Sequence, residues 1–142
     1  MVRGIIGVAG GLASWVLIAT AGNIVMRVAW PDYAQVEKAM EFTPAMMLAR
    51  LLVGAIATIG AGFFGAWLSK GAHRVVAALT GALLVFFIPV HYGLREKFPL
   101  WYHLAFLISL AALTPAGGRL YRAWTIRARG RSASAGEPSV GS

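Results

Sequence analysis

The stretch 51–69 reads LLVGAIATIGAGFFGAWLS and contains no charged side chain. A helix that crosses the hydrocarbon core of a membrane needs about 20 mostly apolar residues. Three further stretches meet this requirement: Gly4–Met26, Val75–Leu94 and Phe98–Gly118. Backbone amides find no water in lipid, so each stretch is expected to be helical. The sequence therefore predicts an all-α fold, a bundle of four transmembrane helices.

The composition excludes a water-soluble globular domain. Of the 142 residues, 58% are hydrophobic and 13% are charged, whereas soluble domains carry about 25% charged residues. A soluble chain of this length buries too little of its surface to hide so many apolar side chains. The absence of cysteine excludes disulfides, thiolate metal sites and a cysteine nucleophile.

We expect one transmembrane domain, residues 1–131, followed by a tail. Its spans are predicted at about 4–28, 44–69, 73–94 and 99–118. The basic segment 119–131 alternates arginines with apolar side chains, which suits an interface with anionic lipid. The tail, residues 132–142, consists mostly of small and polar residues and is expected to be disordered.

The charged side chains are divided unequally between the two ends of the predicted bundle. Arg3, the loop between spans two and three, and the segment 119–131 together hold eight of the 13 Lys and Arg residues. Four of the five acidic residues lie on the opposite side. Lys and Arg favour the cytoplasmic side of a membrane, so both termini are predicted to be cytoplasmic. The net charge of +8 then indicates contact with the lipid bilayer and not with nucleic acid.

The loop between the first two spans is expected to contain a short helix on the outer membrane surface. Asp32 and Gln35 have the spacing of a capping box. Thr43 and Pro44 predict the start of the second span, as an N-cap residue followed by a proline in the first turn. The apolar side chains of the short helix share one face: Tyr33, Val36 and Met40.

Small residues recur every four positions along three of the predicted spans. Such stripes let two helix backbones approach closely. They serve either packing within one chain or an interface with another membrane protein or a second copy, since the pattern does not specify the partner. The positions are Gly7 and Gly11 in the first span, Gly54, Thr58, Gly62 and Ala66 in the second, and Ala77 and Gly81 in the third.

Polar side chains gather toward the outer ends of the spans, where they predict an outward-facing site. Arg50 has two interpretations: a cation that binds an anionic ligand, or an arginine that reaches the outer headgroups, paired with Glu41 or Glu96. Pro89 is expected to kink the third span and open a small pocket. The candidate ligand-binding residues are Asn23, Arg50, His91, Tyr102 and His103.

His91 and His103 each lie six residues from Lys97, at the centre of the turn between spans three and four. This spacing places the two imidazoles at similar depth on adjacent antiparallel helices. Such a pair suits a metal ion or a haem, although a metal site needs a third or fourth ligand. The other interpretation is a pair of interfacial histidines that form hydrogen bonds. We predict no metal site and no cofactor.

The favoured function is that of a structural or accessory membrane protein, or a self-associating bundle. The alternative is a small-ligand binding or transport protein that uses Arg50, His91 and His103. An acidic residue near the middle of a span, as proton-coupled transporters use, is absent. An enzyme is the least favoured class, because no nucleophile or acid partner is apparent.

The runs 88–91 (IPVH) and 98–104 (FPLWYHL) resemble a recurring pattern in small four-helix bacterial inner-membrane proteins, a family without a known activity. The resemblance covers the last two spans well and the first two loosely. It implies a multi-pass protein of the bacterial inner membrane, and it implies no functional residues.

Overall fold

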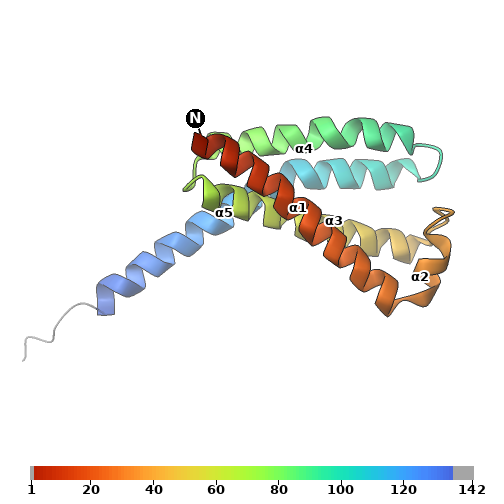
Figure 1. The fold of residues 1–142 in the computed structure, drawn as a ribbon, viewed down its shortest axis with the longest axis horizontal. Helices are drawn as coiled ribbons and strands as arrows, with labels where there is room; N and C mark the ends of the chain where they lie inside the picture. Colours follow the sequence, from red (N-terminus) through yellow and green to blue (C-terminus); the bar gives the residue numbers. More distant parts are fainter. Residues whose placement is uncertain (1, 136–142) are drawn as a thin grey trace, which may run out of the picture.

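The computed structural model describes residues 2–135, and within this range all regular elements are helices. They are α1 (Val2–Ala29), α2 (Pro31–Val36), α3 (Pro44–Leu68), α4 (His73–Gly93) and α5 (Leu100–Ala135). The four long helices are apolar and long enough to cross a membrane, as predicted. Together they suggest a membrane protein built as a helical bundle (Figure 1).

α3 is the central helix of the bundle. It packs most extensively against α1 on one side and α5 on the other, and α4 closes the ring by packing against α5 and α1. α2 and the α4–α5 loop (94–99) lie together at what we call the hairpin end (Figure 1). The N-terminal part of α1, the α3–α4 turn (69–72) and the later part of α5 lie at the terminal end.

The start of α3 follows the predicted signal. The Thr43 hydroxyl accepts a hydrogen bond from the backbone N–H of Met46, and Pro44 follows in the first turn. The capping box predicted at Asp32 and Gln35 is wrong. α2 begins at Pro31, one residue before Asp32, and Trp30 occupies the N-cap position. Proline suits the first turn of a helix because it has no N–H that would need a partner there. Asp32 therefore lies inside the first turn, and its side chain does not cap the helix.

Glycines bring α3 into backbone contact with both neighbours. A side chain at Gly62 of α3 or at Gly117 of α5 would overlap the carbonyl oxygen of the facing helix, Thr114 or Ile59 respectively. On the other side of α3, a Cβ at Gly11 of α1 would lie 3.1 Å from a carbonyl oxygen of α3. Gly7 is similarly close, at 3.1 Å from a carbonyl oxygen of α3. The stripes of the first two spans are therefore used within this chain.

The stripe predicted in the third span does not contact another helix in this way. A Cβ at Gly81 would meet no atom of residues 2–135 within 4 Å. α4 instead buries Val75, Leu79 and Leu83, which follow one another every four residues. Gly81 is two positions out of step with them, so it lies on another face of the helix.

α5 runs well beyond the predicted span. It continues without a break through the basic segment 119–131 to Ala135, and its later part extends away from the other helices (Figure 1). The first four residues of the tail that we expected to be disordered, 132–135, are thus helical. Residues 136–142 lie outside the described part of the chain.

Candidate functional site

A cavity of about 140 Å³ lies at the hairpin end, and all four long helices contribute to it. Four of the five residues predicted from the sequence line it: Asn23, Arg50, His91 and Tyr102. The fifth, His103, lies behind His91 and is buried. The rest of the cavity lining is apolar and aromatic and consists of Trp15, Ala19, Val53, Gly54, Phe87, Val90, Leu94, Phe98 and Phe106.

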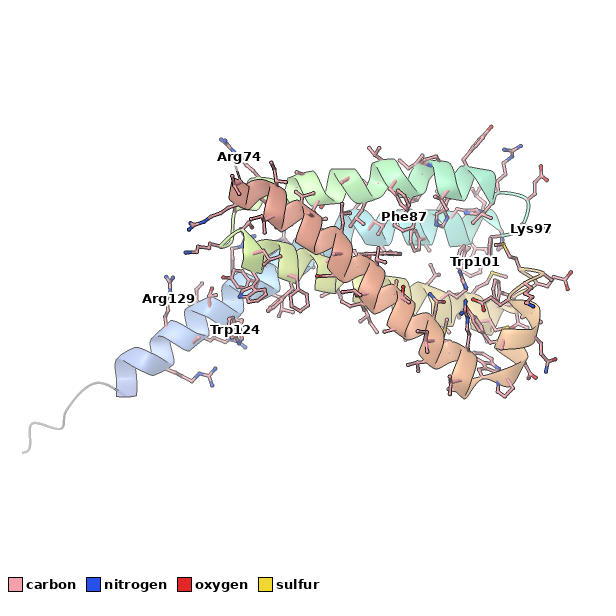
Figure 2. All side chains as sticks on the ribbon, viewed as in Figure 1. Arg74, Phe87, Lys97, Trp101, Trp124 and Arg129 are labelled. Atoms are coloured by element: carbon pink, nitrogen blue, oxygen red, sulfur yellow. The ribbon has the colours of Figure 1, made fainter. Side chains whose placement is uncertain are left out.

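The aromatic side of the cavity joins three helices. The Phe87 ring of α4 points toward the interior of the bundle (Figure 2), with its centroid 4.6 Å from that of Trp15 and 5.1 Å from that of Phe106. The Trp15 indole N–H donates to the Thr58 hydroxyl at 3.1 Å. That bond satisfies a half-buried donor in apolar surroundings, and it orients the indole against the cavity.

Arg50 enters the cavity from α3, and it has no carboxylate partner in the part of the chain that the structure describes. The ion pairs among the described residues are Arg27–Glu37 and Arg95–Glu96, so neither Glu41 nor Glu96 pairs with Arg50. Its guanidinium donates to the Tyr33 hydroxyl and lies over the Phe42 ring, 4.7 Å from the centroid. The Nε atom of Arg50 is buried and has no hydrogen-bond partner within residues 2–135.

Tyr33 lies at the hairpin end, in contact with residues that line the cavity. Its side chain is completely buried in an aromatic cluster with Phe42, Met46, Phe98 and Tyr102. The Tyr33 hydroxyl also donates to the Asn23 side chain at 3.2 Å, so one phenol connects α1 with Arg50 of α3. Burial raises the pKa of Tyr33, and the nearby Arg50 cation opposes that effect. The phenol therefore stays neutral and keeps its donor proton.

α2 is held against α1 by an ion pair outside the cavity. The Arg27 guanidinium donates two hydrogen bonds to the Glu37 carboxylate, at 2.6 and 2.9 Å. This pairing lowers the pKa of Glu37 below its ordinary value. Glu37 thereby compensates the charge of Arg27 and does not pair with Arg50.

His91 and His103 are in direct contact. Their Nδ1 atoms are 2.7 Å apart, and the Nε2 atom of His103 lies 3.2 Å from the Phe98 carbonyl oxygen. A carbonyl only accepts, so Nε2 of His103 carries a proton, and its Nδ1 is then the acceptor. The Nδ1 of His91 must therefore donate. The cavity-lining His91 keeps a lone pair at Nε2, with no hydrogen-bond partner among the described residues.

The contact between the rings bears on the metal or haem site considered for them. Two nitrogens that share a tetrahedral metal ion lie about 3.3 Å apart, given metal–nitrogen bonds of about 2.0–2.1 Å. The direct hydrogen bond between His91 and His103 would have to break before an ion could bind between the two rings. Within residues 2–135, no group of three or more His, Asp or Glu side chains is placed to hold a metal ion.

The directions of these two hydrogen bonds predict opposite tautomers for His91 and His103. His91 is expected to carry its proton on Nδ1 and His103 on Nε2. Long-range ¹H–¹⁵N correlation spectra of the histidine-labelled protein in detergent distinguish the two forms. The exposed His73 provides the signal of a histidine outside the pair. Two rings in the same tautomer would contradict the contact.

The sequence located the polar residues of this site but missed its aromatic lining. Trp15 carried a signal, because it lies in the middle of the first span, far from the interfaces where tryptophan is enriched in membrane helices. Phe87 and Phe106 carried none, since phenylalanine suits a lipid-facing position equally well. Comparison with known protein families, with curated proteins and with solved structures found no match to this chain.

Proposed function

We propose that this chain is a multi-pass protein of a bacterial inner membrane whose hairpin end faces outward. Four apolar helices support the insertion. The side with both termini carries eight of the 13 Lys and Arg residues, which supports a cytoplasmic location for the terminal end. The resemblance of spans three and four to small bacterial inner-membrane proteins supports this choice of membrane.

At its hairpin end, the protein binds a small organic anion. The observation that carries this proposal is the Arg50 guanidinium, which lines a cavity and, among residues 2–135, has no carboxylate partner and no hydrogen-bond partner for its buried Nε. A cation removed from water favours an anionic partner. His91 adds an acceptor at Nε2, and the aromatic rings add apolar contact.

The size of the cavity limits the ligand. A cavity of about 150 Å³ in another protein accommodates benzene, and this one measures about 140 Å³. The proposed ligand is therefore an anion with a body of about one six-membered ring, or the anionic headgroup of a larger amphiphile. A ligand with an acceptor for Arg50 and a donor for His91 satisfies both polar groups.

A structural or self-associating role remains a prediction of the sequence. Its main support was the small-residue stripes, and those of α1 and α3 are used within the chain. Ligand binding is accordingly the function that the geometry supports better.

Binding of 4-hydroxybenzoate to the detergent-solubilised protein tests the proposal. We expect saturable binding by calorimetry at low ionic strength, and weaker binding of the neutral 4-hydroxybenzyl alcohol. Arg50→Met keeps the length of the side chain and removes its charge, and is expected to weaken binding by about tenfold or more, as for the loss of one charged hydrogen bond.

Arg95→Met is the matched control, because Arg95 lies at the same end of the bundle but is exposed and does not line the cavity. This variant is expected to bind as the unaltered protein does. The absence of any difference between Arg50→Met and Arg95→Met, or of binding by the unaltered protein, would contradict an anion site at Arg50.

A further inference from the structure

A second cavity, of about 250 Å³, lies at the terminal end between α4 and α5. His73 and Thr80 of α4 and Arg119 and Arg122 of α5 line it, together with apolar atoms of Val76 and Pro115. It shares no residue with the cavity at the hairpin end. We call it the basic hollow.

Arg122 joins the basic hollow to an adjacent concavity beside the α3–α4 turn. That concavity is lined by Lys70 and Arg129, with Trp67 next to them. The turn brings Lys70 toward α5 because Lys70 and Gly71 both have positive φ, 56° and 83°, which reverses the chain directly after α3. Lys70 of the turn and Arg129 of α5 thus line the same concavity as the half-buried Arg122.

These cations have no acidic partner in the described part of the chain. The acidic residues within 2–135 all lie at or near the hairpin end: Asp32, Glu37, Glu41 and Glu96. Glu137, the fifth, lies outside the described residues. Within residues 2–135, the guanidinium groups of Arg119 and Arg122 form no side-chain hydrogen bond or ion pair. A cavity with this lining favours an anion with several acceptor oxygens, as phosphate has.

The surroundings of the basic hollow favour a phosphate that belongs to a lipid. Its inner lining is apolar at Val76 and Pro115, and the indoles of Trp67 and Trp124 are exposed nearby, as tryptophan often is at the level of lipid headgroups. Figure 2 shows Arg74, Trp124 and Arg129 around this end of the bundle. A free phosphate would use the cations but not the apolar surface beside them.

We propose that the basic hollow binds the phosphate group of an anionic phospholipid, with Arg119 and Arg122 as its principal donors. This site goes beyond the anion cavity at the hairpin end. It rests on membrane insertion, and it does not depend on what the hairpin-end cavity binds. Basic pockets between membrane helices on the cytoplasmic side are a known setting for such headgroups.

Native mass spectrometry of the delipidated protein, titrated with phosphatidylglycerol or with zwitterionic phosphatidylcholine, tests this site. We expect one phosphatidylglycerol to bind in preference to phosphatidylcholine. Arg122→Gln is expected to weaken that binding by about tenfold. Arg127→Gln removes the same charge from the same segment of α5, outside both concavities, and is expected to change it by less than about twofold.

Three outcomes would overturn the lipid site. Equal losses in Arg122→Gln and Arg127→Gln would indicate diffuse attraction to the basic segment. Displacement of the lipid by an equal concentration of inorganic phosphate would identify a soluble source. Unchanged binding in a folded Arg122→Gln would exclude the site. Arg122→Lys, which retains the charge, is expected to keep part of the binding, and circular dichroism of each variant verifies that it folds.

Discussion

Gly117→Ala is expected to lower the stability of the detergent-solubilised protein by about 3 kcal/mol or more, at the upper end of the usual cost of overpacking. The added methyl would overlap the Ile59 carbonyl oxygen and lie 2.8 Å from the backbone nitrogen of Phe63. Neither contact is with a flexible side chain, so α3 and α5 must separate. The fraction of protein that remains monodisperse on size-exclusion chromatography after heating measures the loss.

Gly81→Ala is the matched control for this prediction. It makes the same substitution in another long helix, at a position where a Cβ meets no atom of the described residues within 4 Å. Alanine is also a better helix former than glycine, so the variant is expected to be as stable as the unaltered protein or more so. Gly62→Leu should behave like Gly117→Ala, because its side chain would overlap the Thr114 carbonyl. Equal stability of the Gly117 and Gly81 variants would refute the backbone contact between α3 and α5.

Tyr33→Ala is expected to cost about 3 kcal/mol, as the truncation of other buried aromatic side chains does. The Tyr33 ring is completely buried, 5.3 Å from the Phe42 ring between centroids, and its hydroxyl connects Arg50 with Asn23. The substitution removes both the packing and the bridge. Thermal unfolding of the purified variant, followed by circular dichroism, measures the effect.

Two further variants separate packing from hydrogen bonding. Tyr33→Phe keeps the ring and leaves Arg50 without that acceptor, and we expect a loss of about 1–3 kcal/mol, the cost of an unsatisfied buried polar group. Tyr92→Ala truncates a tyrosine that is 69% exposed and is expected to cost less than about 1 kcal/mol. A Tyr33→Ala variant as stable as Tyr92→Ala would show that α2 does not contribute to the bundle.

The sequence predicted the long helices well because length and apolar composition are sufficient to define them. The Thr43–Pro44 start was also predictable, since its signal is local. The local sequence of a helix does not determine which other helix packs against each of its faces. Gly81 belongs to the same kind of four-residue pattern as Gly62. Gly62 lies against the backbone of α5, whereas Gly81 lies on a face of α4 that packs against no other described helix in this way. Only the rotation of each helix in the assembled bundle distinguishes them.

The candidate site was partly predictable for a related reason. Counting residues from a turn gives the depth of a side chain, and depth was enough to bring His91 level with His103. Depth does not give direction, so the hydrogen bond of Arg50 to Tyr33 could not be anticipated. Tyr33 lies in a loop helix expected on the membrane surface, and its burial depends on how α2 packs against α1 and on side chains such as Phe42 and Met46 that surround its ring.

α5 reaches from the first cavity to the second, and α4 lines both cavities as well. Tyr102 near the start of α5 lines the hairpin-end cavity, and Arg122 lines the basic hollow. At 1.5 Å per residue they are about 30 Å apart, which is about the thickness of the hydrocarbon core. Because α5 is continuous across that distance, tilting it as a rigid body would move the residues that line both cavities. Pro115 lies between Tyr102 and Arg122 and lacks the N–H of a regular helical turn, so α5 bends most easily there.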